Sequence, residues 1–393
     1  MGDKLLALIM AAAMAVSGGA AGAGNAAVQT DKPSVEQSEA AVETNAVKFV
    51  KKMGIGINLG NTFESCGDWI AQWGDGTVKS YETAWGSPVI TKKIIKGYAD
   101  AGFKTLRVPV SWSNMMGDNY TVSSAYASRV KQVVDWAIDS NMYVIINLHY
   151  DNGWMENFPT KKDECMKRYK RIWTQVSELF KDYDEHLIFE GQNEELGWSS
   201  LWNQWGGSKG KAESYALVNE INQTFVDIVR NSGGRNSKRL LLIPGYNTGI
   251  ETTADPLYKV PNDPAGMLAI SCHYYSPSAF AILTEDAEWG KNQYSWGTEN
   301  DMKQLRKSME LIKSRFIDKG IPVIIGEYGC PTENKDMDSV RLYLSSVCKE
   351  AYTRGMCPIL WSTPGHLYDR NTCRMTDKEI AESLKEISRT KRN

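Results

Sequence analysis

Histidine is scarce in this sequence, and the common metal-binding motifs are absent. Only four of the 393 residues are histidine, and no C-x-x-C, H-E-x-x-H or EF-hand string occurs. The seven cysteines are an odd number without regular spacing, so they need not form a disulfide framework in a chain of this length. The sequence therefore predicts no structural or catalytic metal.

An excess of charge of one sign is also lacking. The formal net charge is −2 at pH 7, from 45 basic and 47 acidic residues. Proteins that bind nucleic acid or anionic membrane surfaces normally carry a clear positive excess. Neither partner is expected here. A composition with 42% apolar and 23% charged residues is instead ordinary for a soluble globular protein with a large core.

No apolar run is long enough to cross a bilayer comfortably. The nearest candidate, Leu5–Val16, follows Lys4 and precedes a tract of Ser, Gly and Ala. A basic start, a short apolar run and small residues predict a secretory signal peptide over residues 1–27 and hence a secreted protein without stable membrane insertion. Residues 28–47 are polar without periodicity and predict a flexible linker, which leaves residues 48–393 as one domain.

From residue 53 onward, short apolar runs alternate with longer stretches of helical periodicity. The eight predicted strands are Gly54–Leu59, Thr105–Val110, Tyr143–Leu148, His186–Glu190, Arg239–Pro244, Met267–Cys272, Pro322–Gly326 and Cys357–Trp361. The predicted helices are Ile90–Ala101, Ala125–Ser140, Lys161–Lys181, Ala212–Asn231, Asp301–Lys319, Ser339–Arg354 and Thr376–Thr390. Only the connection between the fifth and sixth strands lacks an obvious helix. This alternation predicts an α/β fold of the closed (β/α)8 (TIM) barrel type.

The glycine-containing string Gly54–Gly60 could suggest a dinucleotide-binding loop. Its glycine spacing differs from that motif, and no helix opens directly after it, so a first barrel strand is the better interpretation. No phosphate-binding glycine string lies near the seventh and eighth predicted strands either. No cofactor is therefore expected, and a cofactor-using barrel enzyme is the weakest alternative.

Polar or aromatic side chains stand at the carboxyl ends of seven predicted strands, where (β/α)8 barrels form their active sites. They are Asn61, Arg107, His149, Asn193 with Glu194, His273 with Tyr275, Glu327, and Trp361. Glu194 and Glu327 are carboxylates that follow buried runs, where a charge is costly unless it has a function. Two such carboxylates on separate strands are what glycosidic bond cleavage requires.

An ordered set of strings resembles glycoside hydrolase family 5, most closely its endo-β-1,4-glucanase (cellulase) branch. The strings are Asn58–Glu64, Leu106–Trp112, Ile146–His149, Asn193-Glu194, His273–Tyr275, Gly326–Gly329 and Leu360-Trp361. The resemblance covers nearly all of the chain from about residue 48. It implies that Glu194 is the general acid/base and that Glu327 is the nucleophile of a retaining enzyme. We expect the ionised Glu327 to raise the pKa of Glu194.

The resemblance also implies roles for the remaining residues at the strand ends. Arg107 and Tyr275 would hydrogen-bond Glu327, and Asn193 would bind the 2-hydroxyl of the sugar. The two histidines, His149 and His273, would orient the sugar and the acid. Trp361 would form the stacking floor, and Asn61 is assigned to substrate binding.

Several of these residues have a structural alternative. Arg107 could be an ordinary buried ion-pair partner, and either histidine could be a satisfied core residue. Glu190 lies four residues before Glu194 on the same strand face, and we interpret it as a structural carboxylate. Glu64 could be a substrate contact or a loop charge.

The sequence departs from the family pattern at two places. Glu195 stands where proline usually follows the Asn-Glu pair, which makes it a rival to Glu194 for the acid role. Ser362-Thr363 stands where Asp-Asn is common after the tryptophan, which leaves the substrate preference open. These departures are the only support for the rival hypothesis of a carbohydrate-binding barrel without catalysis.

The sequence thus predicts a secreted, monomeric endo-β-1,4-glucanase acting on a β-glucan polysaccharide. A polymer is favoured because many tryptophans in predicted loops could line an extended cleft. They are Trp69, Trp73, Trp154, Trp198, Trp202, Trp205, Trp289 and Trp296. Packing within the loops is an equally good interpretation of these side chains. Xyloglucan, mixed-linkage glucan (the lichenase substrate) and mannan stay open as substrates.

Overall fold

The computed structural model describes residues 43–194, 201–202, 204 and 207–392. The predicted signal peptide, most of the predicted linker and three residues of interest (Glu195, Trp198 and Trp205) therefore lie outside the described residues. Among the residues that are described, no helix has the length and apolar character needed to cross a membrane.

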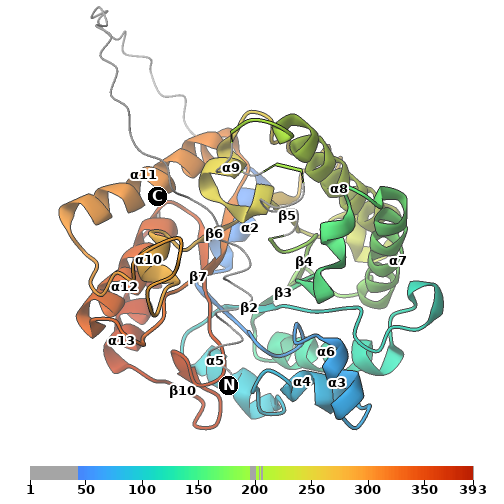
Figure 1. Ribbon diagram of the computed structural model, residues 1–393, viewed down its shortest axis with the longest axis horizontal. Helices are drawn as coiled ribbons and strands as arrows, with labels where there is room; N and C mark the ends of the chain where they lie inside the picture. Colours follow the sequence, from blue (N-terminus) through green and yellow to red (C-terminus); the bar gives the residue numbers. More distant parts are fainter. Residues whose placement is uncertain (1–42, 195–200, 203, 205–206, 393) are drawn as a thin grey trace, which may run out of the picture.

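Eight parallel strands form a closed barrel in sequence order, which confirms the predicted (β/α)8 fold (Figure 1). The strands are β1 Gly56–Asn58, β2 Thr105–Val108, β3 Tyr143–Asn147, β4 Leu187–Glu190, β5 Leu241–Pro244, β6 Leu268–Tyr274, β7 Val323–Tyr328 and β8 Cys357–Leu360. Pairing of Gly56 with Ile359 closes the ring between the first and last strands. All eight strands coincide with predicted apolar runs.

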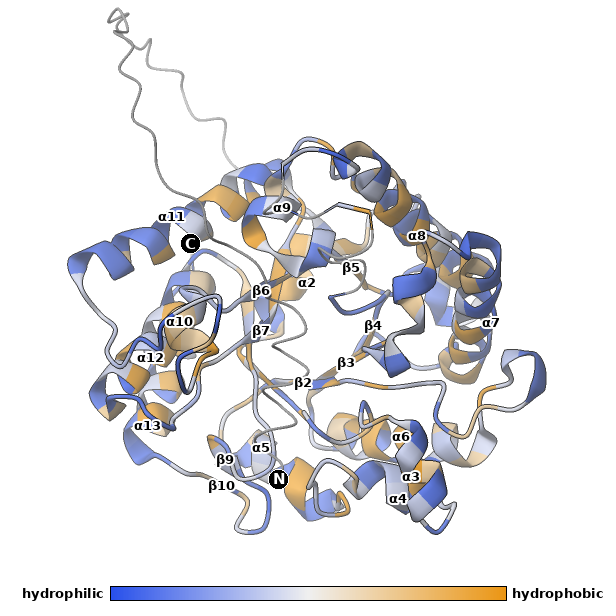
Figure 2. Cartoon of the chain, viewed as in Figure 1, coloured by the Kyte–Doolittle hydropathy of each residue, from blue (hydrophilic) through white to orange (hydrophobic). Residues whose placement is uncertain are grey.

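Helices surround the barrel and carry both hydrophobic and hydrophilic residues along their length, as amphipathic helices do (Figure 2). The helices that follow strands as predicted are α5 Lys92–Asp100, α6 Ser124–Asp139, α7 Lys162–Phe180, α8 Lys211–Asn231, α11 Glu299–Arg315, α12 Met337–Thr353 and α13 Lys378–Ile387. Five of these helices have a side-chain N-cap, and α7 and α8 do not. For example, the Thr298 side chain accepts from the Asp301 amide and the Asp301 side chain accepts from the Thr298 amide, a capping box at the start of α11.

Several short elements were not predicted. The fifth connection contains the short helix α9 Ile250–Ala254, which replaces the full helix of the other units. Besides short 3-10 turns, the remaining described elements are α2 Asn45–Lys52, α3 Asp68–Trp73, α4 Val78–Thr83, α10 Ser278–Ala281 and a hairpin of β9 Tyr368–Asp369 with β10 Arg374–Met375. Elements this short carry too little periodicity to be read from sequence.

Helix α2 closes one end of the barrel and is seen through its centre in Figure 1. Ala46 and Val50 of α2, with Met53 directly after it, belong to a buried cluster with interior side chains such as Ile145 and Leu242. Because α2 begins at Asn45, the folded domain starts a few residues before the expected boundary at residue 48.

Strand alternation decides which side chains reach the barrel interior. On β2, Leu106 and Val108 pack in the large outer cluster between sheet and helices, so Arg107 between them faces inward. Glu190 at the end of β4 faces inward by the same alternation and is fully buried. The carboxyl end of the barrel therefore has a charged and polar interior.

Candidate active site

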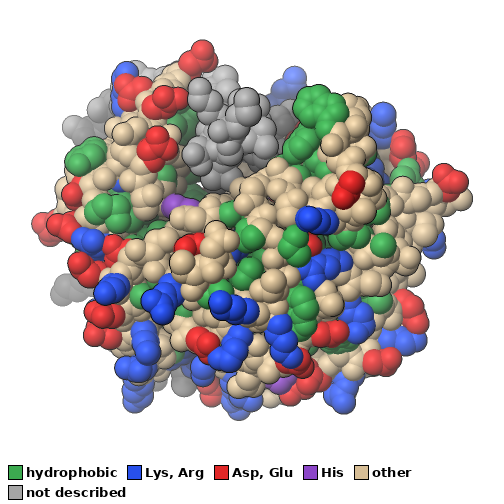
Figure 3. Space-filling model, turned by 90° about the horizontal axis from the view of Figure 1, so that it is seen from below, with side chains coloured by type: hydrophobic (Ala, Val, Ile, Leu, Met, Phe, Trp, Pro, Cys, Tyr) green, Lys and Arg blue, Asp and Glu red, His purple; other side chains and the backbone are tan. Residues whose placement is uncertain are grey.

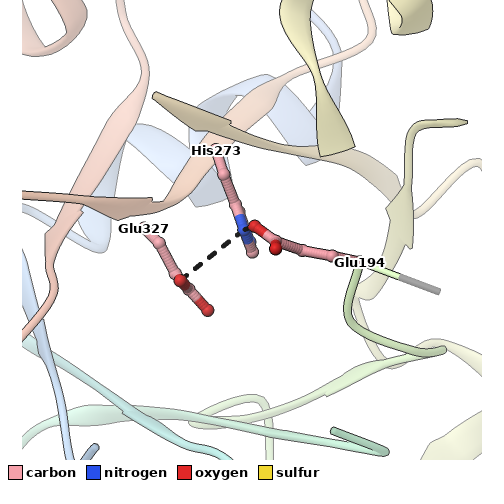
Figure 4. A group of neighbouring side chains, drawn as sticks. All are labelled: Glu194, His273 and Glu327. Carbon is pink, nitrogen blue, oxygen red and sulfur yellow. Dashed lines mark hydrogen bonds and ion pairs between the residues drawn. The ribbon is translucent and has the colours of Figure 1, made fainter. Parts of the chain in front are cut away.

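Glu194 and Glu327 meet at the carboxyl end of the barrel. Glu194 follows β4, Glu327 lies on β7 and His273 lies on β6, and the three side chains point toward one another (Figure 4). One nitrogen or oxygen atom from each of the three side chains lies within 4.8 Å of the other two. The two carboxylates are therefore no more than 4.8 Å apart at their nearest oxygens. Retaining glycosidases place their carboxyl groups at about 5–5.5 Å, whereas inverting enzymes leave about 6.5–9.5 Å for a water.

A bulge in β7 directs Glu327 into the site. Cys272 pairs with Ile325, but the next residue, His273, pairs with Glu327, so Gly326 is an extra residue in the ladder. A Cβ on Gly326 would lie 2.9 Å from Ser271 Oγ and 3.1 Å from His273 Nε2. The bulge therefore needs a glycine in this position, which explains the residue that precedes the glutamate.

Arg107 and Tyr275 both hold Glu327. Arg107 is fully buried, and its Nη1 donates to Glu327 Oε1 at 2.7 Å. The Tyr275 hydroxyl donates to the other carboxylate oxygen at 2.9 Å. These two donors fix the orientation of the carboxylate and favour its ionised form.

Arg107 also organises the residues around it. Its Nε donates to Glu190 at 2.7 Å, and its Nη2 donates to the amide oxygen of Asn193 at 2.8 Å. Glu190 accepts a second hydrogen bond, from Ser271 Oγ at 2.7 Å. Glu190 thus fixes the position of the Arg107 guanidinium, in keeping with a structural carboxylate. Arg107 is a buried ion-pair partner that also contacts Glu327 in the site.

The proton balance of the two glutamates depends on His273. Burial alone would raise the pKa of Glu194, but His273 Nδ1 lies 2.5 Å from Glu194 Oε1 and, with Arg107, lowers this pKa. Burial would lower the pKa of His273, but Glu327 and Glu194 outweigh it and raise that pKa. The expected rise of the Glu194 pKa is thus not found, because His273 and Arg107 outweigh the effect of burial. Glu194 and His273 form a pair that shares one proton.

The pKa of Glu327 is raised, which is opposite to the shift of the Glu194 pKa. Burial raises its pKa and the nearby Glu194 adds to this, while His273 and Arg107 act in the lowering direction. The two carboxylates therefore have different proton affinities although they lie side by side. In the free protein the higher pKa thus falls on Glu327, the reverse of the order in which a protonated Glu194 acts beside an ionised Glu327.

His149, after β3, and Trp361, after β8, form a stacked pair. Their ring centroids are 6.0 Å apart and the planes differ by 5°. Burial, with the charge of Arg107, lowers the pKa of His149 well below its usual value, so the ring is neutral. Asn147 Nδ2 lies 3.2 Å from His149 Nδ1, and because an amide NH2 can only donate, the ring proton sits on Nε2.

Asn61 is held by Glu64, which lies in the same loop. Glu64 accepts the backbone N–H groups of Asn61 and, at 2.9 Å, of Thr62. Asn61 has a left-handed backbone with φ of 57°, which these bonds stabilise. Burial raises the pKa of Glu64 to about 7. Glu64 is therefore a buried residue that fixes the loop conformation through backbone hydrogen bonds. The sequence had suggested a substrate contact or a loop charge, and neither describes this role.

Arg370 is a residue of this region that sequence reasoning missed. It is buried and reaches the same loop from the β9–β10 hairpin, donating to Gly60 O at 2.6 Å and Thr62 Oγ1 at 2.9 Å. The same guanidinium also donates to Ser87 Oγ at 2.8 Å. No local pattern marks this arginine, since all of these contacts are distant in sequence.

A cavity of about 660 Å³ opens beside Glu194 and His273, between the loops that follow β4, β5 and β6. Its wall includes Trp202, Thr248 and Tyr275. Acidic and basic side chains are interspersed over the face seen in Figure 3, in keeping with the low net charge.

The loop tryptophans divide between packing and exposure. Trp154 and Trp296 are buried, which favours loop packing for these two. Trp202 is buried and also borders the cavity. Trp69 is 38% and Trp73 83% exposed on α3, and Trp289 is partly exposed. Loop packing therefore accounts for only part of the set.

Glu194, His273 and Glu327 also lie close enough to share a metal ion. Glu327 Oε1 already accepts a charged hydrogen bond from the Arg107 guanidinium, and a cation there would face that fixed positive charge. The donor set therefore fits acid/base chemistry better than metal binding.

A closed (β/α)8 barrel with two carboxylates this close at the ends of its fourth and seventh strands is the architecture of a glycoside hydrolase. Residues 67–365 match the family model of cellulase (glycosyl hydrolase family 5). The chain belongs to this family, which confirms the resemblance seen in its sequence.

Individual relatives agree with this assignment. The chain is 36% identical over 324 residues to endoglucanase A of Clostridium longisporum, covering 82% of this chain and 60% of the relative. It is 32% identical over 353 residues to endoglucanase A of Ruminococcus albus, covering 87% of this chain and 92% of the relative. The solved structure of a family 5 lichenase from Caldicellulosiruptor sp. F32 superposes with a TM-score of 0.81 at 34% identity, covering 92% of this chain and all of that one.

Proposed function

We propose that this protein is an endo-β-1,4-glucanase that hydrolyses internal bonds of cellulose-like polysaccharides with retention of configuration. The observation that carries the proposal is the spacing of Glu194 and Glu327, whose nearest oxygens lie within 4.8 Å. That spacing suits a nucleophile that attacks the sugar directly and leaves no room for an intervening water.

In the first step, a carboxylate oxygen of Glu327 attacks the anomeric carbon while Glu194 gives its proton to the leaving glycosidic oxygen. The carbon–oxygen bond to the leaving chain breaks as the bond to Glu327 forms. In the second step, Glu194 removes a proton from a water, whose oxygen attacks the same carbon and releases Glu327. Both residues return to their starting states.

The neighbouring residues support these steps. Arg107 and Tyr275 hold Glu327 ready for attack, and His273 supplies Glu194 with a shared proton. Asn193, oriented by Arg107, is the ligand proposed for the sugar 2-hydroxyl, a contact that strengthens in the transition state. Trp361, stacked on His149, offers the floor for a sugar ring, and Asn61 is proposed as a further substrate contact.

A polymeric substrate is supported by the cavity beside Glu194, which can receive sugar units on the leaving-group side. Relatives differ in their named substrates, since they include a xyloglucan-specific endo-β-1,4-glucanase of Bacteroides ovatus at 33% identity and a lichenase. Xyloglucan and mixed-linkage glucan are therefore the second candidates. Secretion through residues 1–27 and a monomeric state belong to the same proposal.

Hydrolysis of carboxymethylcellulose, xyloglucan, lichenan and glucomannan by the purified protein tests the substrate class. Proton NMR of the first-formed anomer tests the mechanism, and an inverted product would rule out the role of Glu327. Glu194→Gln and Glu327→Gln should each lower kcat at least about a thousandfold. The exposed Glu333→Gln is the matched control, and sugar binding without hydrolysis by the wild type would favour a non-catalytic barrel.

A further inference from the structure

Thr248 lies on the loop after β5, within reach of the proposed acid/base. Its Oγ1 is 3.4 Å from Glu194 Oε1 and 2.9 Å from the carbonyl oxygen of Asn247. The residue is 1% exposed and forms part of the wall of the cavity beside Glu194. The hydroxyl is therefore buried at the edge of the reaction centre, and no family string of the sequence includes it.

The backbone that carries this hydroxyl has an unusual conformation. Asn247 and Thr248 both have φ of 47°, in the left-handed region. Two consecutive non-glycine residues in that region are uncommon, and a β-branched threonine there is strained. The surrounding structure must hold such a turn in place.

The contacts that hold the turn are well defined. The Thr248 amide donates to Gly245 O at 3.1 Å, and Thr252 Oγ1 donates to Tyr246 O at 2.7 Å. Tyr246 is buried and packs against the rings of both Trp202 and Tyr215. A fixed turn of this type gives the hydroxyl a constant position relative to Glu194.

A threonine hydroxyl has one proton to donate and can rotate between acceptors. Here two acceptors are within reach, the Asn247 carbonyl and the Glu194 carboxylate. When Glu194 is ionised, donation to Oε1 stabilises its charge. When Glu194 is protonated, the hydroxyl can turn to the carbonyl. The hydrogen bond to Thr248 also acts to lower the pKa of Glu194, in the same direction as the stronger effect of His273.

We infer that Thr248 is a positioning residue whose hydroxyl selectively stabilises the ionised form of Glu194, and that it thereby lowers the upper pH limit of bond cleavage. The inference rests on the acid/base role proposed for Glu194. It assigns to the fifth βα loop a share in controlling the acid, in addition to any contact with substrate.

Thr248→Val removes the hydroxyl and keeps the branched shape of the side chain. Loss of the donor raises the pKa of Glu194, so the protonated acid persists to higher pH. The alkaline limb of kcat/KM on cellotetraose should move up by about half a pH unit, roughly a threefold change in the protonation equilibrium. Thr248→Ser keeps the donor and should leave the limb in place.

A second substrate separates this effect from structural damage. Dinitrophenyl β-cellobioside has a leaving group that departs without a proton, so the alkaline limb of its kcat/KM should be the same in wild type and Thr248→Val. Thr253→Val is the matched control, because Thr253 is buried on α9 of the same loop and its hydroxyl packs against Gly245. This control should leave both profiles unchanged.

An unshifted limb in a folded Thr248→Val enzyme, judged by its thermal unfolding, would overturn the inference. An equal fall in kcat/KM for both substrates without a shift would assign a merely structural role and also overturn it. Full activity of Glu194→Gln would instead refute the proposed function, so the two failures are distinguishable.

Discussion

His273 lies between Glu194 and Glu327, with Nδ1 2.5 Å from Glu194 Oε1 and 3.7 Å from Glu327 Oε2. The negative charges of both carboxylates raise the pKa of a histidine in this position. The site therefore titrates as a group of three, and the protonation of any one member depends on the other two.

The first prediction concerns the titration of His273. Glu327 and Glu194 raise its pKa, so replacing either with glutamine should lower that pKa. NMR titration of the imidazole protons measures the shift. The exposed Glu333→Gln should leave it unchanged, and a His273 pKa that is the same in wild type and Glu327→Gln would contradict the proposed coupling.

The second prediction concerns Arg107→Lys. A lysine cannot reproduce the separate donors that now reach Glu190, Glu327 and Asn193, so we expect kcat/KM to fall at least about a hundredfold. The free energy of unfolding should fall by about 2–4 kcal/mol, because buried carboxylates lose a partner.

Arg129→Lys is the control for this substitution. Arg129 makes two bonds to the buried Glu82 and should therefore lose stability without a change in kcat/KM. Comparable activity of the two variants would show that the donor geometry of Arg107 is unimportant.

The third prediction concerns Gly326→Ala. The added Cβ would meet His273 Nε2 at 3.1 Å and Ser271 Oγ at 2.9 Å, so the bulge must shift and carry Glu327 with it. We expect kcat/KM to fall at least about tenfold and stability to fall by about 1–3 kcal/mol. In the control Gly290→Ala, the nearest atom, Leu283 Cδ1, lies at 3.6 Å, and steady-state kinetics should be unchanged.

The fourth prediction concerns the pH dependence contributed by Glu64. Its pKa is raised from 4.5 to about 7 in the folded protein, so the folded state holds a proton that the unfolded state releases. The free energy of unfolding therefore falls between about pH 4.5 and 7 by about 2–4 kcal/mol from this group.

Glu64→Gln removes that titration and tests the assignment. The substitution should be more destabilising at pH 5 than at pH 7.5 when measured by urea unfolding, because only the wild type loses stability over this range. A destabilisation that is independent of pH would contradict the raised pKa of Glu64.

The sequence predicted the barrel because each strand is an apolar run and each long helix has a periodic apolar face. It also located the seven strand ends, since polar residues after buried runs are conspicuous. The contacts between Arg370 and Gly60 or between Thr248 and Glu194 could not be predicted, because they join distant segments through loops without periodicity. The pKa of Glu194 was wrongly predicted because the 2.5 Å contact with His273 was not visible in the order of residues.

The bond from Arg370 to Gly60 spans 310 positions of the chain and joins its first barrel unit to its last. Contacts of such long range form late in folding, because the intervening chain must be ordered first. The loop that carries Asn61 can thus reach its final conformation only after the ninth and tenth strands have docked. A growing polypeptide would therefore remain inert toward glucan at least until the segment that carries Arg370 had been made and had docked.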